Sequence, residues 1–167
     1  METKHYVDEE GIYLGGFSED TAGIPEGATE VETPPLNASY VWNGSVWIIP
    51  KSVLKEYTAT YRYIKEVGGV TLSGLPLPTD DRAKMLINGA YNKAVLEANP
   101  TAVKHFKLPN GTFIPLTNAD IIGIGAAIAD HVQKCFDSEG AVYVLIDSDD
   151  ITTLAEVESA FDTAYAS

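Results

Sequence analysis

Apolar residues recur every three or four positions between residues 116 and 136, which is the spacing of one face of a helix. The apolar stripe consists of Ile121, Ile124, Ile128, Val132 and Cys135. Gly123 and Gly125 lie beside the stripe and leave room for another element to approach closely. A glycine in a helix interior costs about 1 kcal/mol relative to alanine. Packing has to offset that cost, so we expect this helix to be the buried centre of the domain.

The same periodicity predicts three further helices. One covers residues 52–67, with Ser52 as its cap and a stripe of Val53, Tyr57, Tyr61 and Ile64. A second starts after a cap at Thr79 and runs to about residue 98, with Ala83, Ile87, Ala90 and Ala94 on one face. A third covers about residues 154–165 after a capping box formed by Thr153 and Glu156. Residues 140–146 carry no charge and fit either a strand or a continuation of the central helix.

Alternating apolar residues around turn-forming pairs predict three β-hairpins, at residues 4–17, 39–49 and 103–116. The middle hairpin has Asn43-Gly44 between two tryptophan-containing strands, which is typical of a two-residue type I′ turn. Residues 70–72 fit a short strand, and residues 18–37 have the composition of a linker. The fold class predicted is α+β, with an N-terminal hairpin arm and linker over residues 1–50. A mainly helical domain with a small hairpin follows over residues 51–167.

The net charge of the chain argues against two classes of binding partner. The net charge is −13, and residues 51–135 are the only stretch with a small basic excess. A protein this acidic should not bind nucleic acid or anionic membranes by bulk electrostatics. The longest apolar run has nine residues, far short of the roughly 20 of a membrane-spanning helix, and the charged N-terminus does not resemble a signal peptide. Cys135 is the sole cysteine, and its place in the apolar stripe predicts a buried, inert thiol.

Motifs for catalysis are absent from the sequence. It contains no phosphate-binding glycine loop, HExxH or GxSxG pattern, and His5, His105 and His131 share no spacing suited to a metal. We therefore expect no catalytic residue, no metal site and no cofactor. The remaining candidates are aromatic residues of the arm, which either pack on the body of the protein or bind a partner. They are Tyr6, Tyr13, Phe17, Tyr40, Trp42 and Trp47.

Residues 62–165 resemble a domain of unknown function found in bacteriophage tail genes. The resemblance rests first on Glu66, Gly69 and Gly74 at their spacing, followed by Thr79-Asp80 and Arg82. It continues through the Asn-Gly hairpin of residues 107–113 and through the two C-terminal helical stretches. Those stretches are represented by residues 129–133, Phe136, Glu139, Ile146 and residues 152–157. The resemblance implies that residues 140–146 are helical, and it brings no catalytic residue with it.

Residues 1–50 resemble the N-terminal segments of phage tail-fibre and fibre-assembly proteins. The shared features are Tyr6-Val7-Asp8, Pro34-Pro35 and the Trp42-Asn43-Gly44-Ser45-Val46-Trp47 hairpin. Together the two resemblances imply a virion protein of the tail, assembled in the host cytoplasm, that attaches to tail-fibre or baseplate proteins. The alternatives are an assembly chaperone outside the virion and, remotely, a glycan-acting enzyme. The small residues of the central helix are compatible with a homo-oligomer.

Overall fold

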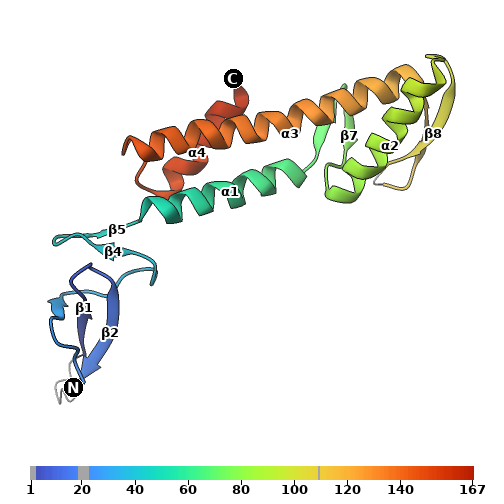
Figure 1. The fold of residues 1–167 in the computed structure, drawn as a ribbon. Helices are drawn as coiled ribbons and strands as arrows, with labels where there is room; N and C mark the ends of the chain where they lie inside the picture. Colours follow the sequence, from blue (N-terminus) through green and yellow to red (C-terminus); the bar gives the residue numbers. More distant parts are fainter. Residues whose placement is uncertain (1–2, 19–22, 109) are drawn as a thin grey trace. The chain divides into compact units, whose positions relative to one another are not determined.

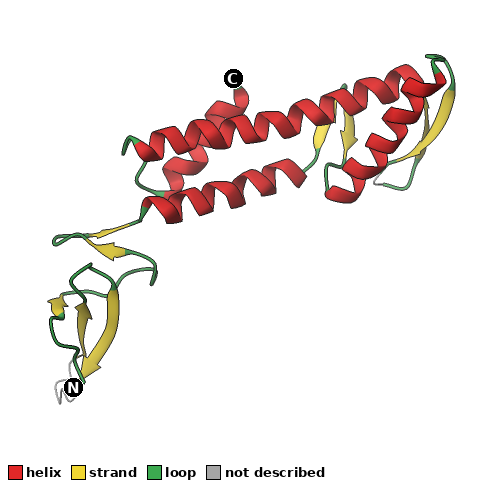
Figure 2. Ribbon diagram, viewed as in Figure 1, coloured by secondary structure: helices red, strands yellow, loops and turns green. Residues whose placement is uncertain are grey.

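The computed structural model describes residues 3–18, 23–108 and 110–167, and it confirms the α+β fold class. Within these residues, four helices and nine short strands follow one another along the chain (Figures 1 and 2). The helices are α1 (Lys51–Val67), α2 (Asp81–Glu97), α3 (Asn118–Asp147) and α4 (Leu154–Ala166). The strands are β1 (Thr3–Val7), β2 (Tyr13–Ser18), β3 (Thr29–Val31), β4 (Val41–Trp42), β5 (Trp47–Ile48), β6 (Val70–Leu72), β7 (Leu75–Leu77), β8 (Val103–Lys107) and β9 (Phe113–Thr117).

The chain divides into two compact units. Unit 1 comprises residues 1–57 and 144–157, and unit 2 comprises residues 58–143 and 158–167. Unit 1 has fourteen acidic and three basic residues, whereas unit 2 has ten acidic and eight basic residues. Unit 1 therefore carries −11 of the net charge of −13, and unit 2 is close to neutral.

The sheet of unit 1 has three antiparallel strands in the order β2-β1-β3. The predicted first hairpin is confirmed by the pairing of β1 with β2. β3 pairs with the other edge of β1, so the expected linker contains a strand, and that part of the prediction is wrong. Its residues 19–22 lie outside the described part of the chain. In Thr29–Val31 the first two residues are exposed and only Val31 is buried, so the strand carries too short an apolar signal to stand out from the surrounding polar residues.

The second hairpin is present, but its turn differs from the prediction. Trp42 pairs with Trp47, which leaves a four-residue loop in place of the expected two-residue type I′ turn. The Asn43 side chain explains the longer loop, because its Oδ1 accepts the N–H groups of Ser45 at 3.0 Å and Val46 at 2.9 Å. An asparagine that bonds its own loop in this way stabilises a turn without a tight two-residue reversal.

Gly11 connects this hairpin to the three-stranded sheet. Its carbonyl accepts the Trp42 N–H at 2.9 Å, and a Cβ atom at this position would lie 2.1 Å from the Trp42 carbonyl oxygen. Its φ of +80° also belongs to the left-handed region that favours glycine. Both facts require a residue without a side chain where the two β-elements of unit 1 meet.

The core of unit 2 lies between α2, α3 and the two hairpins β6–β7 and β8–β9. Its buried members are Leu77, Ile87, Ala94, Leu116, Ile121, Ile124 and Ile128. Three residues of the stripe predicted for residues 116–136, Ile121, Ile124 and Ile128, lie in this core, and so do Ile87 and Ala94 of the predicted second helix. Cys135 of the stripe is buried outside this cluster, and Val132 is only partly buried. The third hairpin is also confirmed, with β8 paired to β9, although Pro109, between the two strands in sequence, lies outside the described residues.

α3 runs through residues 140–146 without interruption, so these residues continue the central helix (Figure 1). Cys135, Ser138, Val142 and Ile146 are all buried and follow one another at helical spacing. Gly140 is exposed and a Cβ atom there would meet nothing within 4 Å. The buried stripe therefore fixes the helix, and the glycine weakens it without ending it.

Two details predicted for the first half of unit 2 are wrong. Ile64, placed in the apolar stripe of α1, is 58% exposed, and the buried positions of that helix are Leu54, Thr58 and Glu66. Thr79 is not the cap of α2, because Asp80 holds that place and accepts the Ala83 N–H. Thr58 and Glu66 in α1 and Thr79 before α2 are buried although they are polar, and an apolar periodicity does not reveal such residues.

Candidate functional site

The six predicted aromatic residues all lie in unit 1, in two groups. Tyr6 is buried and packs edge-on against Phe17, with ring centroids 5.7 Å apart. This pair belongs to the packing of the β1–β2 hairpin.

The second group forms a row of rings across the two β-elements. Trp47 packs edge-on against Trp42 at 5.5 Å and against Tyr13 at 5.9 Å. The Trp47 indole N–H donates to the Thr33 carbonyl at 3.0 Å, and the Tyr13 hydroxyl lies 2.7 Å from His5 Nδ1. All three rings stay half-exposed, so this row fixes the hairpin and also presents aromatic surface to solvent.

Trp47 and Tyr40 also line a groove in unit 1, which we call the Tyr40/Trp47 groove. Its apolar wall includes Leu36, Ile48 and Pro50, and its polar rim includes Asp149, Thr152 and Thr153. Leu36 is 98% exposed. The structure thus brings Tyr13, Tyr40, Trp42 and Trp47 to connected surfaces, and it sets Tyr6 and Phe17 apart from them; partner binding by these residues stays a prediction.

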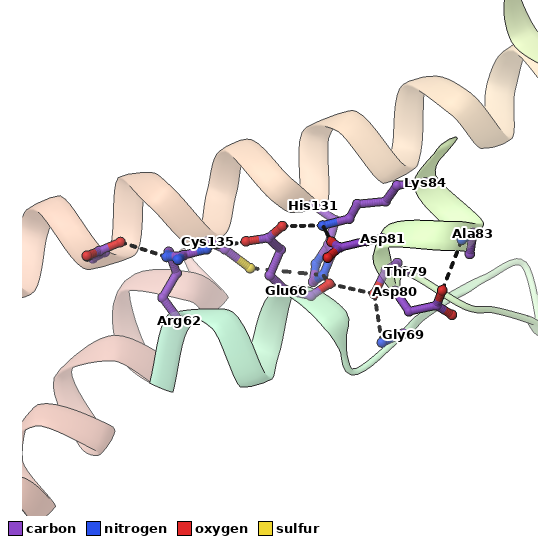
Figure 3. A network of polar contacts seen from close by, with 11 residues as sticks. Arg62, Glu66, Gly69, Thr79, Asp80, Asp81, Ala83, Lys84, His131 and Cys135 are labelled. Atoms are coloured by element: carbon purple, nitrogen blue, oxygen red, sulfur yellow. Dashed lines mark hydrogen bonds and ion pairs between the residues drawn. The ribbon is translucent and has the colours of Figure 1, made fainter. Parts of the chain in front are cut away.

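A second cluster, in unit 2, was not anticipated from the sequence. Figure 3 shows Glu66 of α1 at the centre of a buried polar network. Its carboxylate forms ion pairs with Arg62 on the same helix and with Lys84 of α2. Burial alone lowers the pKa of Lys84, but hydrogen bonds to Glu66 and Asp81 outweigh burial, so this pKa lies above its ordinary value. Lys84 therefore stays charged beside the buried carboxylate.

The main-chain carbonyl of Glu66 is held as firmly as its side chain. The Thr79 hydroxyl donates to it at 2.5 Å, and His131 Nε2 of α3 lies 3.1 Å from it. The same Thr79 oxygen accepts the Gly69 N–H at 2.9 Å. The last carbonyls of a helix have no partner within that helix. Here residues from β7–α2 and α3 supply those partners, so the end of α1 is fixed by side chains distant in sequence.

His131 is held at both ring nitrogens. Because a carbonyl can only accept, Nε2 carries the hydrogen that is donated to Glu66, and in the neutral ring Nδ1 then accepts the Tyr165 hydroxyl at 2.6 Å. Burial raises the pKa of Tyr165, so its hydroxyl stays a donor. The arrangement connects α1, α3 and α4 through one imidazole.

Cys135 lies one helical turn beyond His131, with Sγ 4.0 Å from Nε2, and it is completely buried as predicted. A cysteine nucleophile needs a thiolate and access to substrate. Burial raises the pKa of the Cys135 thiol, with the nearby Glu66 charge adding to the effect. This cysteine–histidine pair therefore lacks both properties of an activated nucleophile.

Arg62 extends the network further along α3. Its Nε lies 2.8 Å from a Glu139 carboxylate oxygen, as an ion pair without the alignment of a hydrogen bond, and its guanidinium stacks over the Phe136 ring at 4.4 Å. The Tyr143 hydroxyl donates to Glu139 at 2.8 Å, and burial together with this bond raises the pKa of Tyr143 to about 12. Both carboxylates, Glu66 and Glu139, are thus engaged by cations or hydroxyls.

These contacts indicate that the network serves to hold the helices of unit 2 together. Glu66 is paired, Cys135 is inaccessible, and the described residues contain no group of three or more His, Cys, Asp or Glu side chains that could hold a metal ion. One signal of it was visible in the sequence, since Arg62 and Glu66 are four residues apart on one helix. The Lys84, His131 and Glu139 contacts had no local signal.

Residues 50–164 match a protein family described as a domain of unknown function (DUF4376). The chain belongs to the DUF4376 family. The matched segment contains α1 to α4, and with them every residue of the buried network. No curated protein and no solved structure matches the chain. Within the described residues, no helix of this DUF4376 protein is both long enough and apolar enough to cross a membrane.

Proposed function

We propose that the protein is a tail-fibre- or baseplate-associated structural protein of a bacteriophage, attached to its partner through unit 1. The observation that carries the proposal is the half-exposed aromatic row of Tyr13, Trp42 and Trp47, continuous with the Tyr40/Trp47 groove. Tryptophan and tyrosine are enriched at the centres of protein interfaces, where they supply large contact area at a low entropic cost. The resemblance of both halves of the chain to phage tail proteins supplies the class of partner.

Charge supports unit 1 as the attachment surface. This unit carries −11, so a partner with a basic surface would be attracted over a distance and oriented before contact. The buried network of unit 2 holds the helices together and contributes no open, reactive group. We therefore assign attachment to unit 1 and structural support to unit 2.

An assembly chaperone is the second candidate, and the same acidity favours it. A strongly charged protein stays soluble while it covers an apolar client surface. The two candidates differ in where the protein ends up: a structural protein remains in the virion, and a chaperone is released.

Mass spectrometry of purified particles of a phage encoding this chain separates the two. We expect the protein at a fixed ratio to known tail proteins, with the Leu36→Glu variant depleted from particles because it places a charge on the exposed wall of the groove. Ile64→Glu, at an exposed apolar residue of α1 in unit 2, is the matched control and should be retained. Presence in infected-cell lysate with absence from particles would favour the chaperone, and retention of Leu36→Glu would remove the groove from the attachment surface.

A further inference from the structure

α2 presents to solvent a ridge with a large apolar side chain at each end. Met85, Gly89, Asn92 and Leu96 follow one another at intervals of four, three and four residues, so they lie on one line along the helix. Met85 is 67% exposed and Leu96 is 85% exposed. Covering these two side chains with a partner would remove apolar surface from water, which is favourable.

A groove lies beside this ridge, between α2 and α3. It is lined by Ile87 and Tyr91 from α2 and by Gly125, Ala129 and Val132 from α3. Gly125 lets the Tyr91 ring approach, since a Cβ atom there would lie 2.7 Å from Tyr91 Cδ2. The small residues of α3 leave a shallow trough that would receive a ridge of side chains from another helix. We call the ridge and groove together the α2/α3 face.

The two edges of the α2/α3 face have opposite charge. At about 100° per residue, Asp130 lies about 140° round α3 from Gly125, and Arg82 lies about 180° round α2 from Tyr91. Asp130 and Asp137 thus border the face on the α3 side, and Arg82 and Lys93 border it on the α2 side. Within the described part of the chain neither Arg82 nor Asp130 forms an ion pair, and both are exposed.

We propose that the α2/α3 face is the interface of a homodimer, in which the α2 ridge of each copy lies in the groove of the other. A second copy supplies a groove to receive the ridge of the first copy and a ridge to fill its groove. It also provides the matching charges, because a two-fold axis parallel to the helices lays the Arg82 edge of one copy on the Asp130 edge of the other. Unit 2 has a net charge of only −2, so two copies meet without strong repulsion.

The charges also select the symmetry. The alternative is a two-fold axis that lies in the interface plane but runs perpendicular to the helices. It would place the two Asp130 edges against each other and the two Arg82 edges against each other. Like charges across an interface are destabilising, so this arrangement is disfavoured. α2 and α3 are antiparallel, since Asn118 at the start of α3 donates to Glu97 at the end of α2. The favoured axis keeps the same antiparallel relation between α2 of one copy and α3 of the other.

Sedimentation velocity of the full chain over about a hundredfold concentration range tests this interface. We expect a monomer–dimer equilibrium that Leu96→Glu weakens by more than about tenfold, since it places a charge on the ridge. Leu36→Glu is the matched control, at an exposed leucine of unit 1, and should leave the equilibrium unchanged. Circular dichroism of each variant verifies that the helices are intact.

Charge reversal tests the pairing itself. Arg82→Asp and Asp130→Arg should each weaken the dimer, and the double variant should restore it to near the original affinity. A monomeric protein at every concentration would overturn the proposal. So would a dimer indifferent to Leu96→Glu, a larger oligomer, or a double variant no better than the single ones. The proposal is independent of the function assigned to unit 1.

Discussion

At Glu66 both the side chain and the main chain hold neighbouring elements in place. The carboxylate bonds Arg62 and Lys84, and the carbonyl accepts Thr79 and His131. Removing one member of a buried ion pair costs more than the pair contributes, because the remaining charge is left buried without compensation. The Glu66 side chain is only 8% exposed, and its loss would leave Arg62 paired with Glu139 alone and Lys84 paired with the exposed Asp81 alone.

We therefore expect Glu66→Gln to lower the free energy of unfolding by about 2–4 kcal/mol. Asp81→Asn is the matched control, because Asp81 pairs with the same Lys84 from a side chain that is 74% exposed. An exposed pair contributes less than about 1 kcal/mol. Urea unfolding followed by circular dichroism measures both variants, and equal losses would show that burial of Glu66 has no special weight.

The glycines of α3 offer a second comparison between residues. Gly123 is exposed, and a Cβ atom there would meet nothing within 4 Å. Gly123→Ala should therefore raise the free energy of unfolding by about 0.5–1 kcal/mol through helix propensity alone. Gly125→Ala gains the same propensity but places its methyl group against Tyr91, so we expect it to be less stable than Gly123→Ala. Thermal unfolding of the pair measures the difference, and identical midpoints would mean that Tyr91 moves aside freely.

At the scale of elements, local spacing predicted most helices and hairpins, and what it missed depends on distant partners. The α3 stripe and the Ile87–Ala94 face of α2 could be predicted because apolar residues recur there at helical intervals. The Glu66 network could not be predicted, since Lys84 and His131 are 18 and 65 residues away from Glu66 in the chain. The α1 stripe was misassigned for the same reason: its buried side is closed by Thr58 and by Glu66 with its cations.

Helix α4 starts with the capping box that the sequence predicts. Glu156 accepts the Thr153 N–H at 2.9 Å, and Thr153 Oγ1 accepts the Glu156 N–H at 3.3 Å. The Thr152 N–H bond, followed by the Thr153 bonds, holds the pKa of Glu156 below its ordinary value. A carboxyl whose pKa is lowered by folding stabilises the native state above its unfolded pKa, and this contribution disappears as pH falls through the folded pKa.

The contribution of the Glu156 charge should consequently depend on pH. We expect Glu156→Gln to lower the melting temperature at pH 7, because glutamine keeps the acceptor oxygen but loses the charge. The difference between variant and wild type should shrink as the pH falls below about 4.5 and vanish in strong acid, where the wild-type carboxyl is protonated too. Melting curves from pH 7 to pH 3 measure this, and a constant difference would assign the effect to shape alone.

At the scale of the whole molecule, charge and apolar exposure are divided between the units. Unit 1 holds most of the negative charge and the exposed aromatic row, and unit 2 is nearly neutral and exposes the α2 ridge. An acidic aromatic surface suits a different, basic partner, whereas a nearly neutral face with opposite edges suits its own copy. The two proposed surfaces share no residue, so each can be disabled without the other.

The substitutions Leu36→Glu and Leu96→Glu should therefore each affect a different property of the protein. Leu36→Glu should abolish incorporation into phage particles while the purified protein still dimerises, and Leu96→Glu should give a monomer. If attachment needs only unit 1, the Leu96→Glu monomer will still enter particles at its usual ratio. Reduced incorporation of that monomer would instead show that two copies of unit 1 must bind together, since a dimer presents two weak attachment surfaces at a high effective concentration. Particle mass spectrometry combined with sedimentation velocity on the same variants distinguishes a molecule with two independent surfaces from one in which dimerisation drives attachment.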